Sequence, residues 1–289
     1  MIQKYIPNSV LSCMEYAKRC DHYIMRDTAK NYGFPNKQIP LNDIKNGDSI
    51  WCHGLQIISL FDFIKTTDLQ DLTLISGDED NTTNPNGTRE LGLKLIHQTS
   101  TDLLPKQFKI WYAQNAQVVN NTMIPIPIGV CPPWGNGVSN SEELFKIMNE
   151  YERNKLLYLN FSFNTRRSQI FDIVTTNMKT MYTSATFEKS KILEYYRGLQ
   201  EHTYTLCPPG NGKDCHRVWE ALYCGSIPIV EYSEANVYFA KMFPILVVER
   251  WSDIIPEYLE NNMDKFINNT WRYDLLDCDN LFKEYFIRD

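Results

Sequence analysis

Long hydrophobic runs are missing from this sequence of 289 residues. No apolar run approaches the ~20 residues that a membrane helix needs, and one of the longest, 243–248, is typical of a buried strand. The first residues lack the stretch of about 7–15 apolar residues found in a secretory signal. We therefore expect a protein without a membrane span that resides in the cytoplasm.

An excess of positive charge is also absent. The chain has 29 Lys and Arg against 35 Asp and Glu, a formal net charge of −6. This balance excludes broad binding to the phosphate backbone of nucleic acid, so any anion site must be local. The 8 cysteines are scattered, and no CxxC pair indicates zinc or redox chemistry. We expect reduced thiols that are mostly buried.

Apolar residues are nevertheless plentiful, at 43% of the chain, which is enough for two domains of ordinary size. Short apolar runs alternate with helix-like segments, a pattern that predicts parallel sheets covered by helices. A stretch rich in Pro and Gly at 131–140 is the candidate linker. The sequence thus predicts an α/β protein with domains at 1–140 and 141–289, the last helix being free to cross back. Its expected strands lie at 49–52, 72–76, 109–113, 123–128, 156–162, 204–207 and 227–230.

One segment, 206–230, combines a strand, a loop rich in Pro and Gly, a helix and a second strand. Asp214 is the expected N-cap of a helix over 215–223, and Gly225 is its expected end. The loop glycines let a ligand approach the backbone, and the free N–H groups of the helix favour an anion.

Three polar side chains follow on that helix, where His216, Arg217 and Glu220 can address the same side of the loop. Arg217 suits a diphosphate, and Glu220 suits sugar hydroxyls. The alternative is a plain turn in which Glu220 only pairs with His216. A P-loop is excluded, because its pattern needs Gly at Cys207 and Ser or Thr at Asp214.

The same segment, Leu-Cys-Pro-Pro-Gly-Asn-Gly-Lys-Asp-Cys-His-Arg-Val-Trp-Glu-Ala-Leu-Tyr-Cys-Gly-Ser-Ile-Pro-Ile-Val, resembles the donor-site signature of exostosin-like glycosyltransferases, the family 47 group. Two further stretches, 111–129 and 157–166, are similar to short cytosolic members from large algal viruses and microbes. Together the resemblance covers the chain from about 70 to 250.

This resemblance implies the GT-B architecture, two Rossmann-like domains facing across a cleft, with the donor held by the C-terminal domain and the acceptor by the N-terminal one. It implies an inverting transferase that moves a hexose or pentose from a nucleoside diphosphate sugar to a glycan hydroxyl. The donor is expected to be a UDP-sugar, with UDP-xylose a candidate because the short viral members include a xylosyltransferase. A viral origin would place the protein in the host cytoplasm.

The resemblance also assigns roles to the donor-site residues. Arg217 contacts the diphosphate, and Glu220 contacts the ribose hydroxyls. The phosphate is further expected to contact Arg166 and the backbone amides of the loop, with His216 beside them. The loop residues in this set are Gly210, Asn211 and Gly212.

An inverting reaction needs one general base. Asp78 is the first candidate and Asp80 the second, because both follow an expected strand at the edge where open α/β sheets hold their ligands. His53, which follows another expected strand, is a third candidate. The alternative is that the acidic cluster only caps or solvates a loop.

Asp78 and Asp80 also spell the Asp-x-Asp pattern with which GT-A transferases hold a metal ion. The basic group of Arg166, Lys213 and Arg217 can neutralise a diphosphate instead, so we expect no metal and no other cofactor. Two alternatives stay open, a metal-dependent transferase using Asp78 and Asp80, and a non-catalytic glycan-binding protein on a transferase-like fold.

Overall fold

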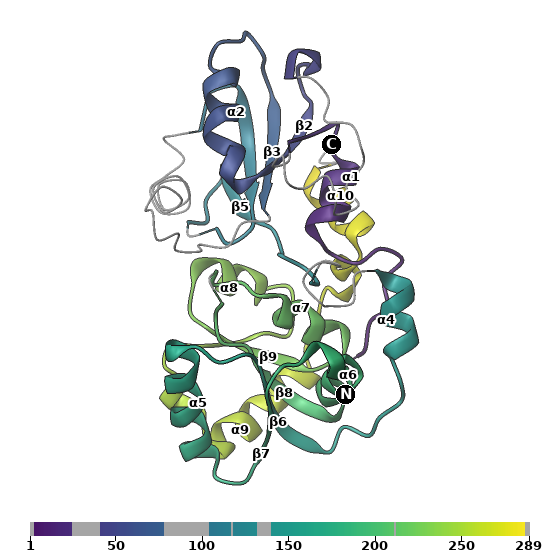
Figure 1. Ribbon diagram of the computed structural model, residues 1–289, viewed down its shortest axis with the longest axis vertical. Coiled ribbons are helices and arrows are strands. Elements are labelled where there is room, and N and C mark those ends of the chain that lie inside the picture. Colours follow the sequence, from purple (N-terminus) through teal and green to yellow (C-terminus); the bar gives the residue numbers. More distant parts are fainter. Residues whose placement is uncertain are drawn as a thin grey trace. The chain divides into compact units, whose positions relative to one another are not determined.

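The computed structural model describes residues 3–24, 41–77, 104–116, 118–131, 140–210 and 212–286. Its strands form two five-stranded sheets, and all strand pairs in both sheets are parallel. The expected α/β class with parallel sheets is therefore confirmed. Figure 1 shows the two sheets with the helices that accompany them.

The chain divides into two compact units. We call residues 12–128 the N-terminal unit, and residues 1–11 together with 129–289 the C-terminal unit. This division differs from the expected split after residue 140, because the first residues pair with the C-terminal unit. The Tyr5 amide donates to the Tyr223 carbonyl at 3.0 Å, and the Val130 amide donates to the Leu11 carbonyl at 2.8 Å. The last helix, α10 (Cys278–Phe286), also belongs to the C-terminal unit.

In the N-terminal unit the strands lie side by side in sequence order. Helix α2 (Ile57–Ile64) buries four apolar side chains, Ile57, Leu60, Phe61 and Ile64, whose spacing places them on one helical face. They pack with Leu74 and Trp111 of the sheet in one core. The other elements are α1 (Cys13–Arg19), β1 (His22–Ile24), β2 (Ser49–His53), β3 (Leu72–Gly77), β4 (Phe108–Ala113) and β5 (Met123–Pro125).

In the C-terminal unit the strand order is β10-β9-β8-β6-β7, so the chain adds β7 on one side of β6 and then returns to add β8 on the other. The strands are β6 (Lys155–Asn160), β7 (Tyr182–Ala185), β8 (His202–Leu206), β9 (Ile227–Glu231) and β10 (Leu246–Val248). The helices are α4 (Ser141–Ile147), α5 (Thr165–Met178), α6 (Ile192–Glu201), α7 (His216–Tyr223), α8 (Glu234–Phe239) and α9 (Pro256–Ile267).

The reversal in strand order places helices on both faces of this sheet. Right-handed crossovers put α5 on one face and both α6 and α7 on the other, as Figure 1 shows. On the first face, Ile170, Val174 and Met178 of α5 join the core formed with Leu157 and Leu206. The sheet is thus covered while its carboxyl edge stays available for the loops that follow β6, β8 and β9.

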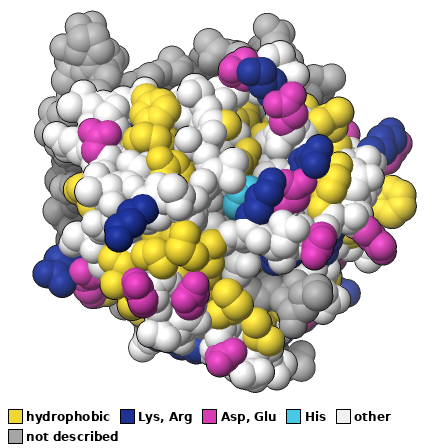
Figure 2. All heavy atoms as spheres, turned by 90° about the horizontal axis from the view of Figure 1, so that it is seen from below, with side chains coloured by type: hydrophobic (Ala, Val, Ile, Leu, Met, Phe, Trp, Pro, Cys, Tyr) yellow, Lys and Arg dark blue, Asp and Glu magenta, His cyan; other side chains and the backbone are white. Residues whose placement is uncertain are grey.

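The surface carries charges of both signs. Figure 2 shows basic and acidic side chains interspersed among apolar ones on one face, as the near balance of charges in the sequence leads one to expect. Within the part of the chain that the structure describes, no helix combines the length and apolarity needed to cross a membrane. All eight cysteines are free thiols, and five of them are buried.

Candidate functional site

The carboxyl edge of the C-terminal sheet contains a topological switch point. β6 and β8 are neighbours in the sheet, yet the chain reaches β8 only after adding β7 on the opposite side. Loops diverge where strand order reverses, and open α/β sheets bind their ligands in the crevice formed there. The loops in question follow Asn160 at the end of β6 and Leu206 at the end of β8.

Arg217 lies at this switch point, on the first turn of α7. Its Nε donates to the carbonyl oxygen of Asn160 at 2.8 Å, and its guanidinium lies 5.5 Å from the ring centroid of Phe161. The buried Nη1 atom has no hydrogen-bond partner among the described residues. A buried N–H group of a cation that lacks an acceptor is costly, so this position favours an anionic ligand.

Arg217 also remains charged. Desolvation lowers its pKa, but the nearby Tyr195 and Cys215 more than offset this effect and raise the pKa of the guanidinium.

Arg167, at the start of α5, joins the two loops. Its Nε donates to the Pro209 carbonyl at 3.2 Å, and its Nη1 donates to the Ser162 carbonyl at 3.1 Å. A Cβ at Gly210 would lie 3.3 Å from Arg167 Nη2, so the glycine allows this close approach. Gly212 is buried in the same loop, whereas Asn211 lies outside the described residues. Arg167 thus ties Pro209 of the predicted loop to Ser162, just after β6.

The start of α7 differs from the prediction. Cys215, not Asp214, is the N-cap residue, and its side chain makes no capping hydrogen bond. The Asp214 carboxylate instead accepts from Trp219 Nε1 at 2.9 and 3.0 Å, because a buried indole N–H needs an acceptor. The end of the helix is confirmed, since α7 stops at Tyr223 and Gly225 has a φ of +73°.

The N-cap thiol of Cys215 lies where negative charge is favoured. A hydrogen bond from Cys207 outweighs desolvation and, together with the positive charges of Arg217 and Arg167, lowers the pKa of Cys215 to about 6. Both thiols flank the same loop, at its two ends. The two arginines near the loop therefore favour the thiolate form of Cys215.

Glu220, one turn further along α7, is buried with 5% of its surface exposed. Its Oε2 accepts a hydrogen bond of 2.6 Å from the Tyr195 hydroxyl of α6, while Oε1 accepts none from the described residues. Burial, followed by the charge of Glu220, raises the pKa of Tyr195, so the phenol stays protonated and donates. The carboxylate is thereby oriented with one oxygen available for a ligand.

His216 does not pair with Glu220, as the plain-turn alternative required. Its Nδ1 lies 2.8 Å from the Gly129 carbonyl oxygen, so the ring contacts the segment that opens the second part of the C-terminal unit. His216 and Glu220 therefore have separate partners.

Arg166 and Lys213, two of the expected phosphate contacts, meet at a carboxylate that the sequence analysis did not single out. Arg166 Nη2 lies 2.6 Å from Glu231 Oε2, and Lys213 donates to the same oxygen. Partial burial raises the pKa of Glu231, but these hydrogen bonds outweigh it and lower the pKa. The structure thus pairs both cations with Glu231 at the end of β9, whereas Arg217 has no such partner.

The candidate bases belong to the N-terminal unit. β3 ends at Gly77, which confirms the strand before Asp78, but Asp78 and Asp80 lie outside the described residues. His53 ends β2, is buried, and is paired in register with Gly77. The base assignment therefore stays a prediction.

Sequence reasoning missed three residues of this site, Arg167, Tyr195 and Glu231. Arg167 stands next to the chosen Arg166, and only the direction of the helix decides which of the two faces the loop. Tyr195 and Glu231 act across 25 and 65 residues of sequence, respectively. No local pattern signals such contacts.

Comparisons with known proteins give one family match and one structural likeness. Residues 144–284, within the C-terminal unit, match the family model described as the RXYLT1 C-terminal domain. A crystal structure of AviGT4, a glycosyltransferase involved in avilamycin A biosynthesis, is similar with a TM-score of 0.34 and 10% identity, over 84% of this chain and 85% of that one. No curated protein matches the chain in sequence. The residues of the family match include the loop after β8 and helix α7.

Proposed function

We propose that this protein is a glycosyltransferase that takes a sugar from a nucleoside diphosphate sugar bound at the carboxyl edge of the C-terminal sheet. The observation that carries the proposal is the guanidinium of Arg217, which is held at the switch point by Asn160 and has no carboxylate partner among the described residues. A guanidinium with an unused N–H group in this position matches the diphosphate that such a donor brings.

The other donor-site residues have complementary tasks. The backbone amides of 210–212 and the uncapped start of α7 face the phosphates. Glu220 accepts from the ribose hydroxyls through the oxygen that Tyr195 leaves open. Arg166 moves from Glu231 to a phosphate when the donor binds, and His216 lies beside the same loop. Arg167 keeps the loop in position without needing to touch the donor.

The finer features of the proposal come from the resemblance to exostosin-like transferases. They are a GT-B architecture, inversion at the anomeric carbon, and a UDP-sugar donor, with UDP-xylose the first to test. The N-terminal unit supplies the acceptor site for a glycan hydroxyl. Asp78, or else Asp80, removes the proton from that hydroxyl while Arg217 stabilises the departing diphosphate.

Calorimetry with UDP and UMP tests the site directly. Arg217→Ala is expected to weaken UDP binding by about tenfold to a hundredfold, the value of one charge-assisted hydrogen bond. UMP binding should change less, because UMP lacks the second phosphate. Glu220→Gln should weaken both nucleotides equally, since the ribose is common to them.

Arg250→Ala is the matched control, because Arg250 is exposed and pairs only with Asp253 three residues away. Equal UDP binding by Arg217→Ala and the unmodified protein would reject the site. A protein that binds glycans but neither UDP nor GDP would instead support the glycan-binding alternative.

Catalysis is tested with a panel of UDP-sugars that includes UDP-xylose, scored by release of UDP. Asp78→Asn is expected to abolish turnover while UDP binding is retained, and Asp80→Asn should have the smaller effect. Turnover that persists in EDTA would support the metal-independent mechanism. Turnover lost in EDTA and restored by Mn²⁺ would favour the metal-dependent alternative through Asp78 and Asp80.

A further inference from the structure

A second pocket lies on the C-terminal unit, beneath α6 and beside the edge strand β7. Its volume is about 380 Å³, within the roughly 300–1,000 Å³ typical of small-molecule sites. It is open because α6 covers β6 and leaves β7 uncovered, so that Thr183, Ser184 and Ala185 are exposed. Glu220 takes its hydrogen bond from a different residue of α6, Tyr195, which does not line this pocket.

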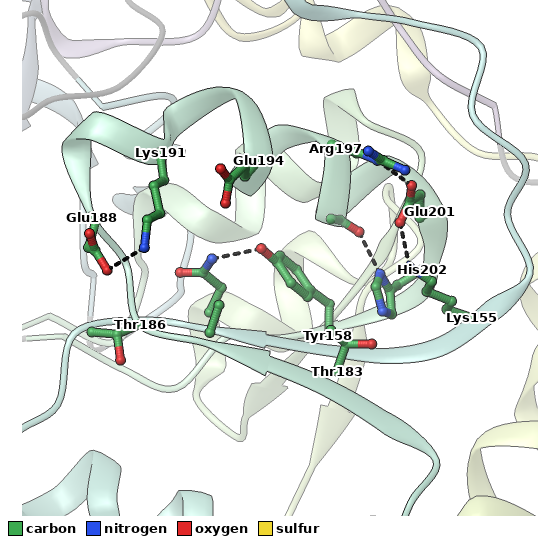
Figure 3. Close-up of a pocket in the computed structure, with 13 residues that line it drawn as sticks. Lys155, Tyr158, Thr183, Thr186, Glu188, Lys191, Glu194, Arg197, Glu201 and His202 are labelled. Atoms are coloured by element: carbon green, nitrogen blue, oxygen red, sulfur yellow. Dashed lines mark hydrogen bonds and ion pairs between the residues drawn. The ribbon is translucent and has the colours of Figure 1, made fainter.

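The floor of the pocket is built around the ring of Tyr158. This ring packs directly against α6 at Gly198, where a Cβ would lie only 2.2 Å from Tyr158 Cζ. It also stacks on the His202 imidazole, with ring centroids 4.9 Å apart and an interplanar angle of 26°. Figure 3 shows Tyr158, Thr183 and His202 on the sheet side of the pocket and Glu194 on the helix side.

Among the side chains that line this pocket, two buried acceptor atoms, Asn160 Oδ1 and His202 Nε2, receive no hydrogen bond from the described residues. Asn160 is 5% exposed and His202 is 1% exposed. Asn160 donates from Nδ2 to the Tyr158 oxygen at 2.7 Å, and its Oδ1 has no partner among the described residues. The His202 Nδ1 bonds to the Gly198 carbonyl at 2.7 Å and must therefore carry the hydrogen. Nε2 is then a lone-pair acceptor, also without a partner in the described chain.

The charges around the pocket exclude an anionic ligand. Three basic and three acidic side chains line it, and every basic one is already in an ion pair. Only the Glu194 carboxylate has neither a hydrogen bond nor an ion pair among the described residues. The pairs are Lys191 with Glu188, Lys155 with Glu201, and Arg197 with Glu201. The unsatisfied groups thus call for a ligand that carries no negative charge and is rich in hydrogen-bond donors.

The geometry points to a carbohydrate-binding subsite in this pocket, which adjoins the donor site at Asn160, in which the hydroxyls of a neutral sugar donate to Asn160, His202 and Glu194. Each sugar hydroxyl brings one O–H donor. The acceptors lie at the end of β6 (Asn160), at the start of β8 (His202) and on α6 (Glu194). A phosphate would meet only acceptors and paired cations. The subsite can hold part of a glycan chain outside the reaction centre.

The test is nuclear magnetic resonance of protein labelled only in its histidine rings, in the absence of nucleotide. The chain has 5 histidines, so the His202 signal can be assigned by replacing each one in turn with Gln. Addition of D-xylose or D-glucose is expected to produce a saturable shift of the His202 Nε2 resonance. Inorganic phosphate at the same concentration should leave it unchanged.

Two variants on one strand provide a matched control. Thr183→Trp fills the pocket from its open side and should abolish the shift, whereas Ser184→Trp places the same ring on the opposite face of β7 and should retain it. Glu194→Gln, at an exposed position, should weaken sugar binding about tenfold.

The absence of a saturable His202 shift with both sugars would overturn the inference, as would an equal shift in Thr183→Trp or with phosphate. Measuring UDP binding by the same variants separates this test from the test of the donor site. Thr183→Trp should bind UDP normally, so a failure of the sugar subsite would not imply a failure of the proposed enzymatic function.

Discussion

The Tyr195 hydroxyl donates to Glu220 Oε2 at 2.6 Å, and this buried contact joins α6 to α7 at the candidate donor site. Tyr195 comes from the helix before the switch-point strand β8, and Glu220 from the helix after it. The carboxylate is therefore oriented by a neighbouring element and not by its own helix. Pre-orientation of this kind reduces the loss of side-chain entropy when a ligand binds.

Replacement of Tyr195 tests this orientation. Tyr195→Phe should lower stability by about 1 kcal/mol through the lost hydrogen bond and weaken UDP binding about tenfold. Tyr204→Phe is the matched control, because Tyr204 is also buried and donates at 2.7 Å, but to the Leu259 carbonyl in the core. Urea unfolding and calorimetry measure both effects. An equal loss of UDP affinity in the two variants would contradict the positioning role.

Gly225 and Gly47 both have a left-handed backbone conformation, but only Gly225 has neighbouring atoms close to where a Cβ would lie. Both have positive φ, +73° and +84°, so alanine at either position should cost about 1 kcal/mol. A Cβ at Gly225 would also lie 3.2 Å from the Gln3 backbone, whereas nothing lies within 4 Å at Gly47. Gly225→Ala is thus expected to be the more destabilising in thermal unfolding, and the opposite order would refute this account of the N-terminal segment.

Gly198→Ala reverses the usual effect of such a change in a helix. Alanine normally stabilises a helix interior by about 1 kcal/mol relative to glycine. Here the added Cβ would collide with the buried Tyr158 ring, so we expect a net loss of about 1–3 kcal/mol. In a Tyr158→Ala background the same substitution should become stabilising. A double-mutant cycle by urea unfolding measures the coupling, and a coupling near zero would show that the ring moves aside.

Cys215 should be the most reactive of the eight cysteines near neutral pH. Its pKa is lowered to about 6, first by the hydrogen bond from Cys207, and the thiolate is the nucleophilic form. Alkylation by iodoacetamide, followed by peptide mass spectrometry, should rise with pH at a lower pH for Cys215 than for an ordinary thiol. Burial raises the pKa of Cys52 and Cys224, so these two should react slowly and serve as internal controls. Slow modification of Cys215 below pH 8 would contradict the prediction.

His202 should make the free energy of unfolding depend on pH. Desolvation lowers its pKa to about 4, so the unfolded chain binds a proton near pH 6.5 while the folded protein does not. Stability is thus complete above pH 6.5 and falls as the pH drops towards 4, by up to about 3 kcal/mol. Urea unfolding at pH 7 and pH 5 measures this loss, which should shrink in His202→Gln. An unchanged pH dependence in that variant would assign the effect to other groups.

Several elements follow from local sequence because their signals are local. The apolar runs at 49–52, 72–76 and 227–230 became β2, β3 and β9, since each is a short buried run flanked by turn residues. β7 was missed because its residues are largely exposed and show no apolar alternation.

The predicted N-cap of α7 was wrong because a contact outside the N-cap position engages the Asp214 side chain. Asp214 has a side chain that favours the N-cap position, so the sequence predicts that α7 starts there and not at Cys215. Trp219 decides between them, because its buried N–H takes the Asp214 carboxylate and leaves Cys215 to begin the helix. The choice between Arg166 and Arg167 is similar, since only the packed helix determines that Arg166 meets Glu231 and Arg167 meets the loop.

Local sequence is enough to predict the α/β class, the order of strand, loop, helix and strand across 206–230, and the presence of Arg217 and Glu220 on one helix. These depend on hydrophobic period and turn chemistry, which act over a few residues. Long-range packing, by contrast, determines that Asn160 holds Arg217, that Tyr195 orients Glu220, and that unsatisfied acceptors line a second pocket. Those contacts join residues far apart in the chain, and their energies arise from burial, which exists only once the sheet has formed.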